Sequence, residues 1–150
     1  MYFLGTSADG KDQTGLASSA DLLHWTEATN APVLPVRPAQ FDSRVAEPGP
    51  SPILTHGRNK TILLYYNGAD DKLVYRTGAA IFDGNDPRKL LARTNQPLFA
   101  PEKEWEKVGR VPNVVFVEGM IHRGNRWLFY YGGADQSVGV AVAFAIPLKD

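Results

Sequence analysis

The sequence repeats itself at an interval of 65 residues. ILLYYNGADD at residues 62–71 recurs as WLFYYGGADQ at residues 127–136. Each copy is an apolar run that contains two adjacent tyrosines and leads into a Gly-Ala-Asp sequence. Repeats of a fixed period form supersecondary units that stack on their neighbours, because one unit cannot bury its apolar face alone. The chain is therefore expected to fold as a row of similar units.

Short apolar runs separated by turn residues surround both copies. Runs of this length, rich in Val, Ile, Tyr and Phe and bounded by Gly, Asn or Asp, are typical of β-strands. The strands predicted for the two copies span residues 50–55, 60–68, 72–82, 113–121, 126–133 and 137–146. The apolar residues of 60–68 and 126–133 are consecutive, which indicates inner strands that are covered on both faces.

A third and weaker copy opens the chain. Residues 2–19 give an aromatic strand, an Ala-Asp turn and a Gly-Leu-Ala strand, and HWTEA at 24–28 is predicted as the outer strand of that unit. Repeated antiparallel units favour a β-propeller, which needs at least four blades of about 40–50 residues to close. We therefore predict an all-β fold, a partial propeller of about two and a half blades. It would be a single domain with units of approximately 1–40, 41–100 and 101–150.

Composition narrows the classes of function. The 16 basic and 16 acidic residues cancel and form no like-charged block, which argues against a nucleic-acid or membrane-surface partner. The lack of cysteine excludes disulfides and thiolate chemistry, and three scattered histidines predict no metal site. No cofactor motif is present. With no signal-peptide pattern and no apolar run near the roughly 20 residues that span a bilayer, a soluble cytoplasmic protein is expected.

One segment has a helical signature. In DPRKLLAR at 86–93, Asp86 could serve as the N-cap and Pro87 stands at the first helical position. The segment is short, and an irregular connector fits it equally well.

Three acidic residues stand in unusual settings. Glu47 lies in FDSRVAEPGPSPI (41–53), where prolines fix the backbone and so locate the neighbouring carboxylate. Glu118 interrupts the apolar strand of VPNVVFVEGMI (111–121), and Asp135 follows the second Tyr-Tyr strand. A carboxylate at the end of a buried strand is costly unless it is paired or has a function.

These linked motifs resemble glycoside hydrolase family 130. The resemblance covers nearly the whole chain and rests on LASSADLLHWTEA, FDSRVAEPGPSPI, LLYYNGAD, PLFAPEKEWEKVGRVPNVVFVEG and WLFYYGGADQSVGVAVA in this order. It implies a five-bladed propeller, an activity of the mannoside phosphorylase or β-mannosidase type, and a mannose-containing oligosaccharide as the partner. The Glu-Pro-Gly-Pro sequence with Glu118 downstream looks like the hydrolytic branch, because glutamates in place of phosphate-holding cations would repel phosphate and could orient water.

The resemblance also implies roles for single residues. Inverting glycosidases use one carboxylic acid to protonate the leaving oxygen and one carboxylate to activate water, about 6.5–9.5 Å apart. Glu47 and Glu118 are assigned to the water side, and Asp135 to hydroxyls of the sugar in the cleaved position. The weaker lining candidates are Asp42, Arg44, Tyr66, Asn67 and Tyr131.

The general acid of the family has no counterpart in the sequence. In the family it is an aspartate of an N-terminal blade, accompanied by an Asp-Pro-Arg motif. NDPRK at 85–89 contains the same letters, but it follows a predicted blade and is not equated with that motif. The chain alone is therefore expected not to turn over substrate.

Structural roles remain open for the same residues. Glu47 and Glu118 could be satisfied acids that anchor a loop or a strand, and Asp70 is predicted to be a turn former. The tyrosine pairs are expected mainly in the core, because neighbouring strand residues face opposite sides. The chain could instead be an inactive carbohydrate-binding fragment or a mannoside phosphorylase. It could also be a half-propeller whose open edges pair with a second copy or a complementary chain.

Overall fold

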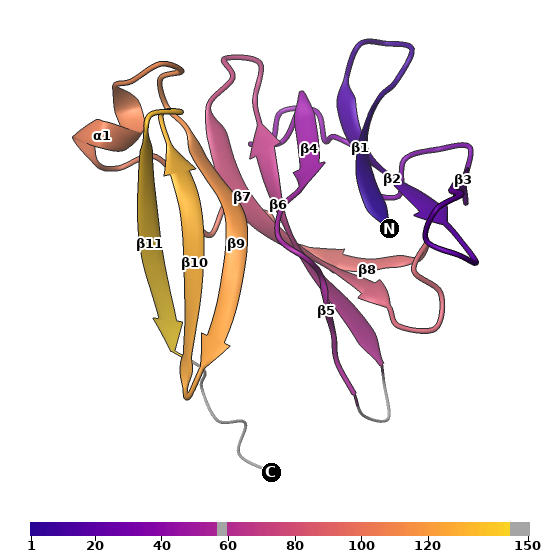
Figure 1. Cartoon of the computed structure of the whole chain (residues 1–150). Coiled ribbons are helices and arrows are strands. Elements are labelled where there is room, and N and C mark those ends of the chain that lie inside the picture. Colours follow the sequence, from indigo (N-terminus) through magenta and orange to yellow (C-terminus); the bar gives the residue numbers. More distant parts are fainter. Residues whose placement is uncertain (57–59, 145–150) are drawn as a thin grey trace.

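In the computed structural model, which describes residues 1–56 and 60–144, the chain is almost entirely β-sheet. Figure 1 shows three groups of strands that follow one another along the chain. The first group is β1 (Tyr2–Thr6), β2 (Asp12–Ser18) and β3 (Thr26–Glu27). The second is β4 (Val45–Pro48), β5 (Ile53–Leu54), β6 (Thr61–Ala69), β7 (Tyr75–Asp83) and β8 (Leu90–Arg93). The third is β9 (Val115–Arg123), β10 (Arg126–Gly133) and β11 (Ser137–Phe144), preceded by the one-turn helix α1 (Glu104–Lys107).

The three groups are copies of one arrangement. Each contains an antiparallel hairpin whose turn lies at the same end of the molecule, at the top of Figure 1. The residue pairs that close the hairpins are Thr6–Asp12, Ala69–Tyr75 and Gly133–Ser137. Parallel bridges, Asp12–Val45 and Tyr75–Val114, join the second strand of one hairpin to the start of the next group. The all-β, partial-propeller prediction is confirmed, while the unit boundaries near residues 40 and 100 stay a prediction.

The second group is a four-stranded blade whose inner strand is interrupted between β4 and β5. β4 and β5 both pair with β6, which pairs with β7, which pairs with β8. Glu47 therefore lies on a strand and not in the rigid loop that the prolines suggested. Of the strand predicted at 50–55, only Ile53–Leu54 forms, because Pro50 and Pro52 lack the amide hydrogens that a ladder uses. The sequence THGRNK at 55–60, which contains glycine and polar residues, predicts a turn between the strands expected at 50–55 and 60–68, and it lies partly outside the described residues.

The helical interpretation of residues 86–93 is wrong. Asp86 opens a turn in which the Lys89 amide donates to the Asp86 carbonyl at 2.9 Å, and Leu90–Arg93 then forms β8. A helix this short does not recover the cost of nucleation on its own. The outer edge of β7, in contrast, offers backbone partners to an extended chain.

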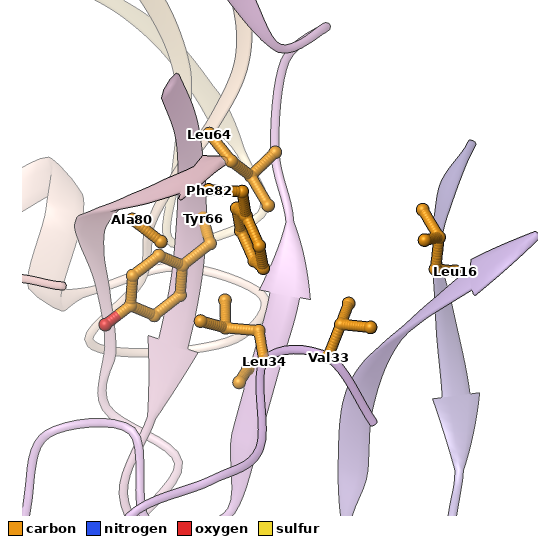
Figure 2. Close-up of a cluster of buried hydrophobic side chains, with 8 residues drawn as sticks. Leu16, Val33, Leu34, Leu64, Tyr66, Ala80 and Phe82 are labelled. Carbon is orange, nitrogen blue, oxygen red and sulfur yellow. The ribbon is translucent and has the colours of Figure 1, made fainter. Parts of the chain in front are cut away.

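The main hydrophobic core lies between the first and second groups. Figure 2 shows side chains of β6 and β7, including Leu64, Tyr66 and Phe82, gathered near Leu34 of the segment between β3 and β4. These four side chains are fully buried. Leu16 of β2 reaches the same cluster from the first group, so the core joins the two groups. Among the described residues, no helix is long and apolar enough to cross a membrane.

A buried polar cluster fixes the loop that leads into β4. The Tyr66 hydroxyl donates to Asp42 Oδ2 at 2.7 Å, and neither side chain is exposed. Arg37 donates to both Asp42 oxygens at 3.1 and 2.9 Å, and Arg93 of β8 donates to Oδ2 as well. The Arg93 guanidinium also lies over the Tyr66 ring, 5.1 Å from its centre. Asp42 and Tyr66 therefore hold the blade together, and a role for them in sugar binding stays a prediction.

The third group repeats this arrangement with different side chains. The Tyr131 hydroxyl donates to Glu106 Oε1 at 2.8 Å, and Glu106 Oε2 accepts the amides of Glu102 and Lys103 at 2.7 and 2.8 Å. Trp105 stacks on Tyr131 with ring centres 5.6 Å apart, as Phe41 stacks on Tyr66 at 6.0 Å. Tyr131 is thus also bonded within its blade, and its role as a lining residue of the sugar site stays a prediction.

We predict that Asp42→Ala lowers the free energy of unfolding by about 3–5 kcal/mol, because two arginines and a tyrosine hydroxyl then lose the carboxylate that accepts their hydrogen bonds. Chemical denaturation monitored by tryptophan fluorescence measures the change. The control is Asp86→Ala, which removes an Asp–Arg pair at the surface and should leave the midpoint nearly unchanged. Equal effects of the two substitutions would contradict the proposed role of the cluster.

Candidate active site

Three of the predicted acids meet at one cavity. An open hollow of about 450 Å³ lies between β4, the start of β7, and the third group. Its lining residues are Glu47, Leu73, Tyr75, Val111, Val114, Phe116, Glu118, Gly132 and Asp135. The structure thus brings Glu47, Glu118 and Asp135 together although they are up to 88 residues apart in sequence.

A larger hollow elsewhere has fewer acidic side chains that could take part in a reaction. It measures about 1080 Å³ and lies between the first and second groups, with mostly apolar walls that include Leu16, Trp25 and Leu54. Its charged lining residues, Asp86 and Arg88, form an ion pair with each other. We therefore place the candidate site in the smaller cavity, where carboxylates without such partners gather.

Glu47 reaches the cavity from β4, close to the inner strand of the next group. Its strand pairs with β6 through the Glu47–Asn67 register, and Gly49 follows two residues later. A side chain at Gly49 would put its Cβ 2.8 Å from the Val117 carbonyl oxygen and 3.1 Å from that of Tyr65. The glycine therefore allows β4 to approach β9, the strand that carries Glu118.

Glu118 is the extra residue of a β-bulge. Val117 pairs with Tyr131 and Gly119 pairs with Tyr130, so no residue of β10 stands opposite Glu118. Bulges bend a strand and redirect a side chain, and they recur beside active sites. Val117 is fully buried, whereas Glu118 is exposed and lines the cavity beside the half-buried Phe116. The bulge explains how a carboxylate can interrupt an apolar strand without being buried.

Asp135 occupies a tight hairpin turn. Ala134 and Asp135 have φ values of +48° and +51°, and the Gln136 amide donates to the Gly133 carbonyl at 3.1 Å. Two positive φ values in a row are typical of the type I′ turn, which matches the twist of the strands it joins. Two further backbone bonds, from Val111 to Ala134 and from Ala134 to Val114, hold the turn over the cavity wall.

Asp70, the counterpart of Asp135 in the repeat, does a different job. Its carboxylate accepts the Lys72 and Val74 amides at 3.0 and 3.2 Å and pairs with Arg76 at 2.8 Å. Asp70 is therefore a turn former, as predicted. Its carboxylate is fully used within the turn, and it lies outside the acidic cavity.

The cavity acids have no stabilising partners within residues 1–56 and 60–144. No hydrogen bond or ion pair joins the side chains of Glu47, Glu118 or Asp135 to another described residue, so the anchoring role left open for Glu47 and Glu118 finds no support. Burial raises the pKa of Glu47, and the charges of Glu118 and Asp12 raise it further. A general base works best when its pKa lies near the operating pH. Glu47 is shifted in that direction.

Three residues at or near the cavity were not predicted. Tyr75 and Phe116 line it with ring centres 5.9 Å apart, and Asp12 is close enough for its charge to act on both Glu47 and Tyr75. Asp12 and Tyr75 are equivalent in the repeat, because each opens the second strand of a hairpin and bridges to the next group. An alignment of the repeats at these positions could have singled them out.

The remaining predicted lining residues lie away from the cavity. Asn67 is fully buried: it donates to the Val117 carbonyl at 3.1 Å and accepts the Val117 amide at 2.9 Å, which joins the second and third groups. Arg44 is exposed and does not line the hollow, although its charge acts on Tyr75. Asp42, Tyr66 and Tyr131 likewise do not line the cavity. Among the described residues, no group of three or more His, Asp or Glu has the arrangement of a metal site.

Comparison with known proteins identifies the family of the chain. The sequence model of glycoside hydrolase family 130, described as beta-1,4-mannooligosaccharide phosphorylase, matches residues 2–146. The chain belongs to glycoside hydrolase family 130. The solved family members that it resembles are five-bladed propellers, and this chain corresponds to part of such a propeller.

Curated relatives of the family are phosphorylases. The chain is 40% identical to a 1,2-beta-oligomannan phosphorylase of Thermoanaerobacter sp. (strain X514) over 90% of its own length and 43% of the relative. It is 37% identical to a beta-1,2-mannobiose phosphorylase of Listeria innocua, over 82% of its length and 33% of the relative. The chain thus spans less than half the length of these relatives.

Solved structures of the family include both reaction types. The Listeria innocua beta-1,2-mannobiose phosphorylase in complex with beta-1,2-mannobiose superimposes with a TM-score of 0.83 at 33% identity, covering 93% of this chain and 38% of that one. A second structure has a TM-score of 0.77 at 32% identity, covering 98% and 50%. Its description reads "The GH130 family of mannoside phosphorylases contains glycoside hydrolases that target beta-1,2 mannosidic linkages in Candida mannan".

We predict that Glu47→Gln raises the thermal unfolding midpoint at pH 7 and has no such effect at pH 3.5. The raised pKa of Glu47 means that the native state holds this proton more tightly than the unfolded chain, whose glutamates titrate near about 4.3. Its contribution to stability is complete below that pH and is lost as the pH rises through the native pKa. Glutamine mimics the protonated form at every pH. Calorimetry at both pH values measures the difference.

The exposed Glu27 of β3 supplies the control, since Glu27→Gln should give no pH-dependent gain. A gain of equal size at pH 3.5 and pH 7 for Glu47→Gln would contradict the electrostatic origin of the effect.

Proposed function

We propose that this chain forms part of the sugar-binding and reaction site of an enzyme that hydrolyses β-mannosides. The observation that supports it is the convergence of Glu47, Glu118 and Asp135 on one cavity, in a chain of a mannoside-acting family. Asp135, at a turn rigidly held over the cavity, would bind hydroxyls of the mannose in the cleaved position. Glu47 and Glu118 would hold and deprotonate the attacking water.

The charge of the cavity favours water over phosphate as the nucleophile. Three carboxylates line it, and no lysine or arginine is among its described lining residues. A phosphate dianion entering this cavity would meet repulsion from like charges that are partly removed from water. Water carries no charge and can donate hydrogen bonds to carboxylates.

In the proposed reaction, water attacks the anomeric carbon from the side of the glutamates. The new carbon–oxygen bond forms as the bond to the leaving sugar oxygen breaks, and a glutamate accepts the proton of the water. The leaving oxygen takes its proton from a general acid, which we assign to no residue of this chain. A complementary part of a propeller would have to supply that acid.

Phosphorolysis is the second candidate. The curated relatives at 40% and 37% identity are both named as phosphorylases. Arg44, whose charge acts on Tyr75 of the cavity, is a cation that could attract a phosphate ion. A non-catalytic carbohydrate-binding role is the third candidate, because the general acid lies outside the residues described.

Binding is the first test, and it does not depend on the missing acid. We expect the protein to bind β-1,2-mannobiose in isothermal titration calorimetry, and Asp135→Asn to weaken binding about tenfold through the loss of a charged hydrogen-bond acceptor. Asp70→Asn is the matched control, because Asp70 holds the same position of the repeat but lies outside the acidic cavity. Equal losses in the two variants would place the sugar elsewhere.

The second test separates the reactions. With 2,4-dinitrophenyl β-mannoside, whose leaving group needs no general acid, we expect slow phenolate release that is independent of phosphate. Glu118→Gln should lower this rate about 100-fold, the usual contribution of a general base, while Glu27→Gln retains it. Acceleration by phosphate with formation of mannose 1-phosphate would establish the phosphorylase instead. Binding without any release would support the non-catalytic role.

A further inference from the structure

Tyr75 is the one described lining residue of the acidic cavity whose side chain can donate a hydrogen bond when the carboxylates are ionised. It is the first residue of β7, and it closes the β6–β7 hairpin opposite Ala69. The equivalent residues of the other two hairpins are Asp12 and Ser137. The repeat thus puts a polar residue at this position of each blade, and only in the second blade is it long, aromatic and part of the cavity lining.

The Tyr75 hydroxyl differs from the hydroxyls of three other tyrosines, Tyr2, Tyr66 and Tyr131. Tyr66 and Tyr131 donate to carboxylates of their own blades, and the Tyr2 hydroxyl donates to the Pro87 carbonyl. Within residues 1–56 and 60–144, the Tyr75 hydroxyl forms no such bond. Its ring is half-buried, lines the cavity and packs against Phe116, and its hydroxyl is available to a ligand.

The hydrogen-bonding capacity of the cavity shows why a donor matters there. An ionised carboxylate can only accept hydrogen bonds, whereas each sugar hydroxyl both donates and accepts. Of the lining side chains, those of Glu47, Glu118 and Asp135 are acceptors when ionised, and the others except Tyr75 are apolar or glycine. A sugar in this cavity therefore has several partners for its hydrogens and one side-chain partner for its oxygen lone pairs.

The protonation state of Tyr75 suits this role. Burial raises its pKa, and the charges of Glu47, Asp12 and Asp135 raise it further, while Arg44 acts in the opposite direction. The phenol therefore keeps its proton across the physiological range. A tyrosine also combines an apolar face with a polar tip, so its ring and that of Phe116 can pack against the C–H face of a sugar while the hydroxyl bonds to it.

We propose that Tyr75 is a sugar-binding residue of the cavity, whose hydroxyl donates a hydrogen bond to a mannose oxygen that the surrounding carboxylates cannot serve. This inference rests on the proposed function, because it takes the ligand to be a β-mannoside. It adds a specificity determinant: the site should select a sugar that presents an oxygen to Tyr75 and an apolar face to the pair of Tyr75 and Phe116.

Calorimetric titration of the protein with β-1,2-mannobiose and with a series of its monodeoxy derivatives tests the assignment. We expect Tyr75→Phe to weaken binding of the parent disaccharide about threefold to tenfold, the usual effect of one neutral hydrogen bond. Wild-type protein should bind every deoxy derivative that loses a contact more weakly. The Tyr75→Phe variant should bind one of these derivatives as well as it binds the parent disaccharide.

Tyr65→Phe is the matched control, since Tyr65 is also half-buried but lies outside the cavity and packs on Phe129. It should leave all affinities unchanged, and thermal unfolding of both variants should match that of the wild type. Unchanged affinity of Tyr75→Phe, or equal loss for every derivative, would overturn the role of Tyr75 while leaving mannoside binding intact. Absence of binding by the wild-type protein would instead overturn the proposed function and this inference with it.

Discussion

The hydrogen bond from a strand tyrosine to a buried carboxylate is the contact on which the two later blades depend. It links the middle strand of a blade to the loop that enters its inner strand, through Tyr66 and Asp42 and again through Tyr131 and Glu106. Burial raises the pKa of both phenols to about 12, so each remains a donor. Because the inner strands β4 and β9 carry Glu47 and Glu118, this contact also helps to position these two acids.

Close packing of aromatic rings over glycine accompanies each tyrosine–carboxylate bond. A Cβ at Gly133 would stand 2.3 Å from the Trp105 ring, and one at Gly68 would stand 3.0 Å from the Phe41 ring. The glycines that follow the tyrosine pairs are therefore required by this packing. The Gly-Ala-Asp sequence of the repeat combines a packing requirement in its glycine with an aspartate whose role differs between copies.

The repeat made the fold predictable, and the same repeat obscured part of the site. Equal spacing and apolar runs were sufficient for the strands and the propeller, because both follow from local patterns. The packing roles of Tyr66 and Tyr131 could not be predicted in this way. Their partners, Asp42 and Glu106, lie 24 and 25 residues upstream, and each acid simply follows an aromatic residue. The strand β8 depends on an open edge of β7, and the bulge at Glu118 depends on pairing with β10; neither leaves a pattern in its own segment.

The cavity brings acidic side chains together without hydrogen bonds from described residues that would stabilise their charges. Three carboxylates without described partners line it, and burial followed by the charges of Glu118 and Asp12 raises the pKa of Glu47. The buried acids of the packing clusters, in contrast, are each held by several donors: Asp42 by Arg37, Arg93 and Tyr66, and Glu106 by two amides and Tyr131. The same fold therefore satisfies its acids where they only support the blade and leaves them unsatisfied where a ligand can reach them. A sugar with many hydroxyl groups would supply the missing donors, which explains why such a site keeps its carboxylates unpaired.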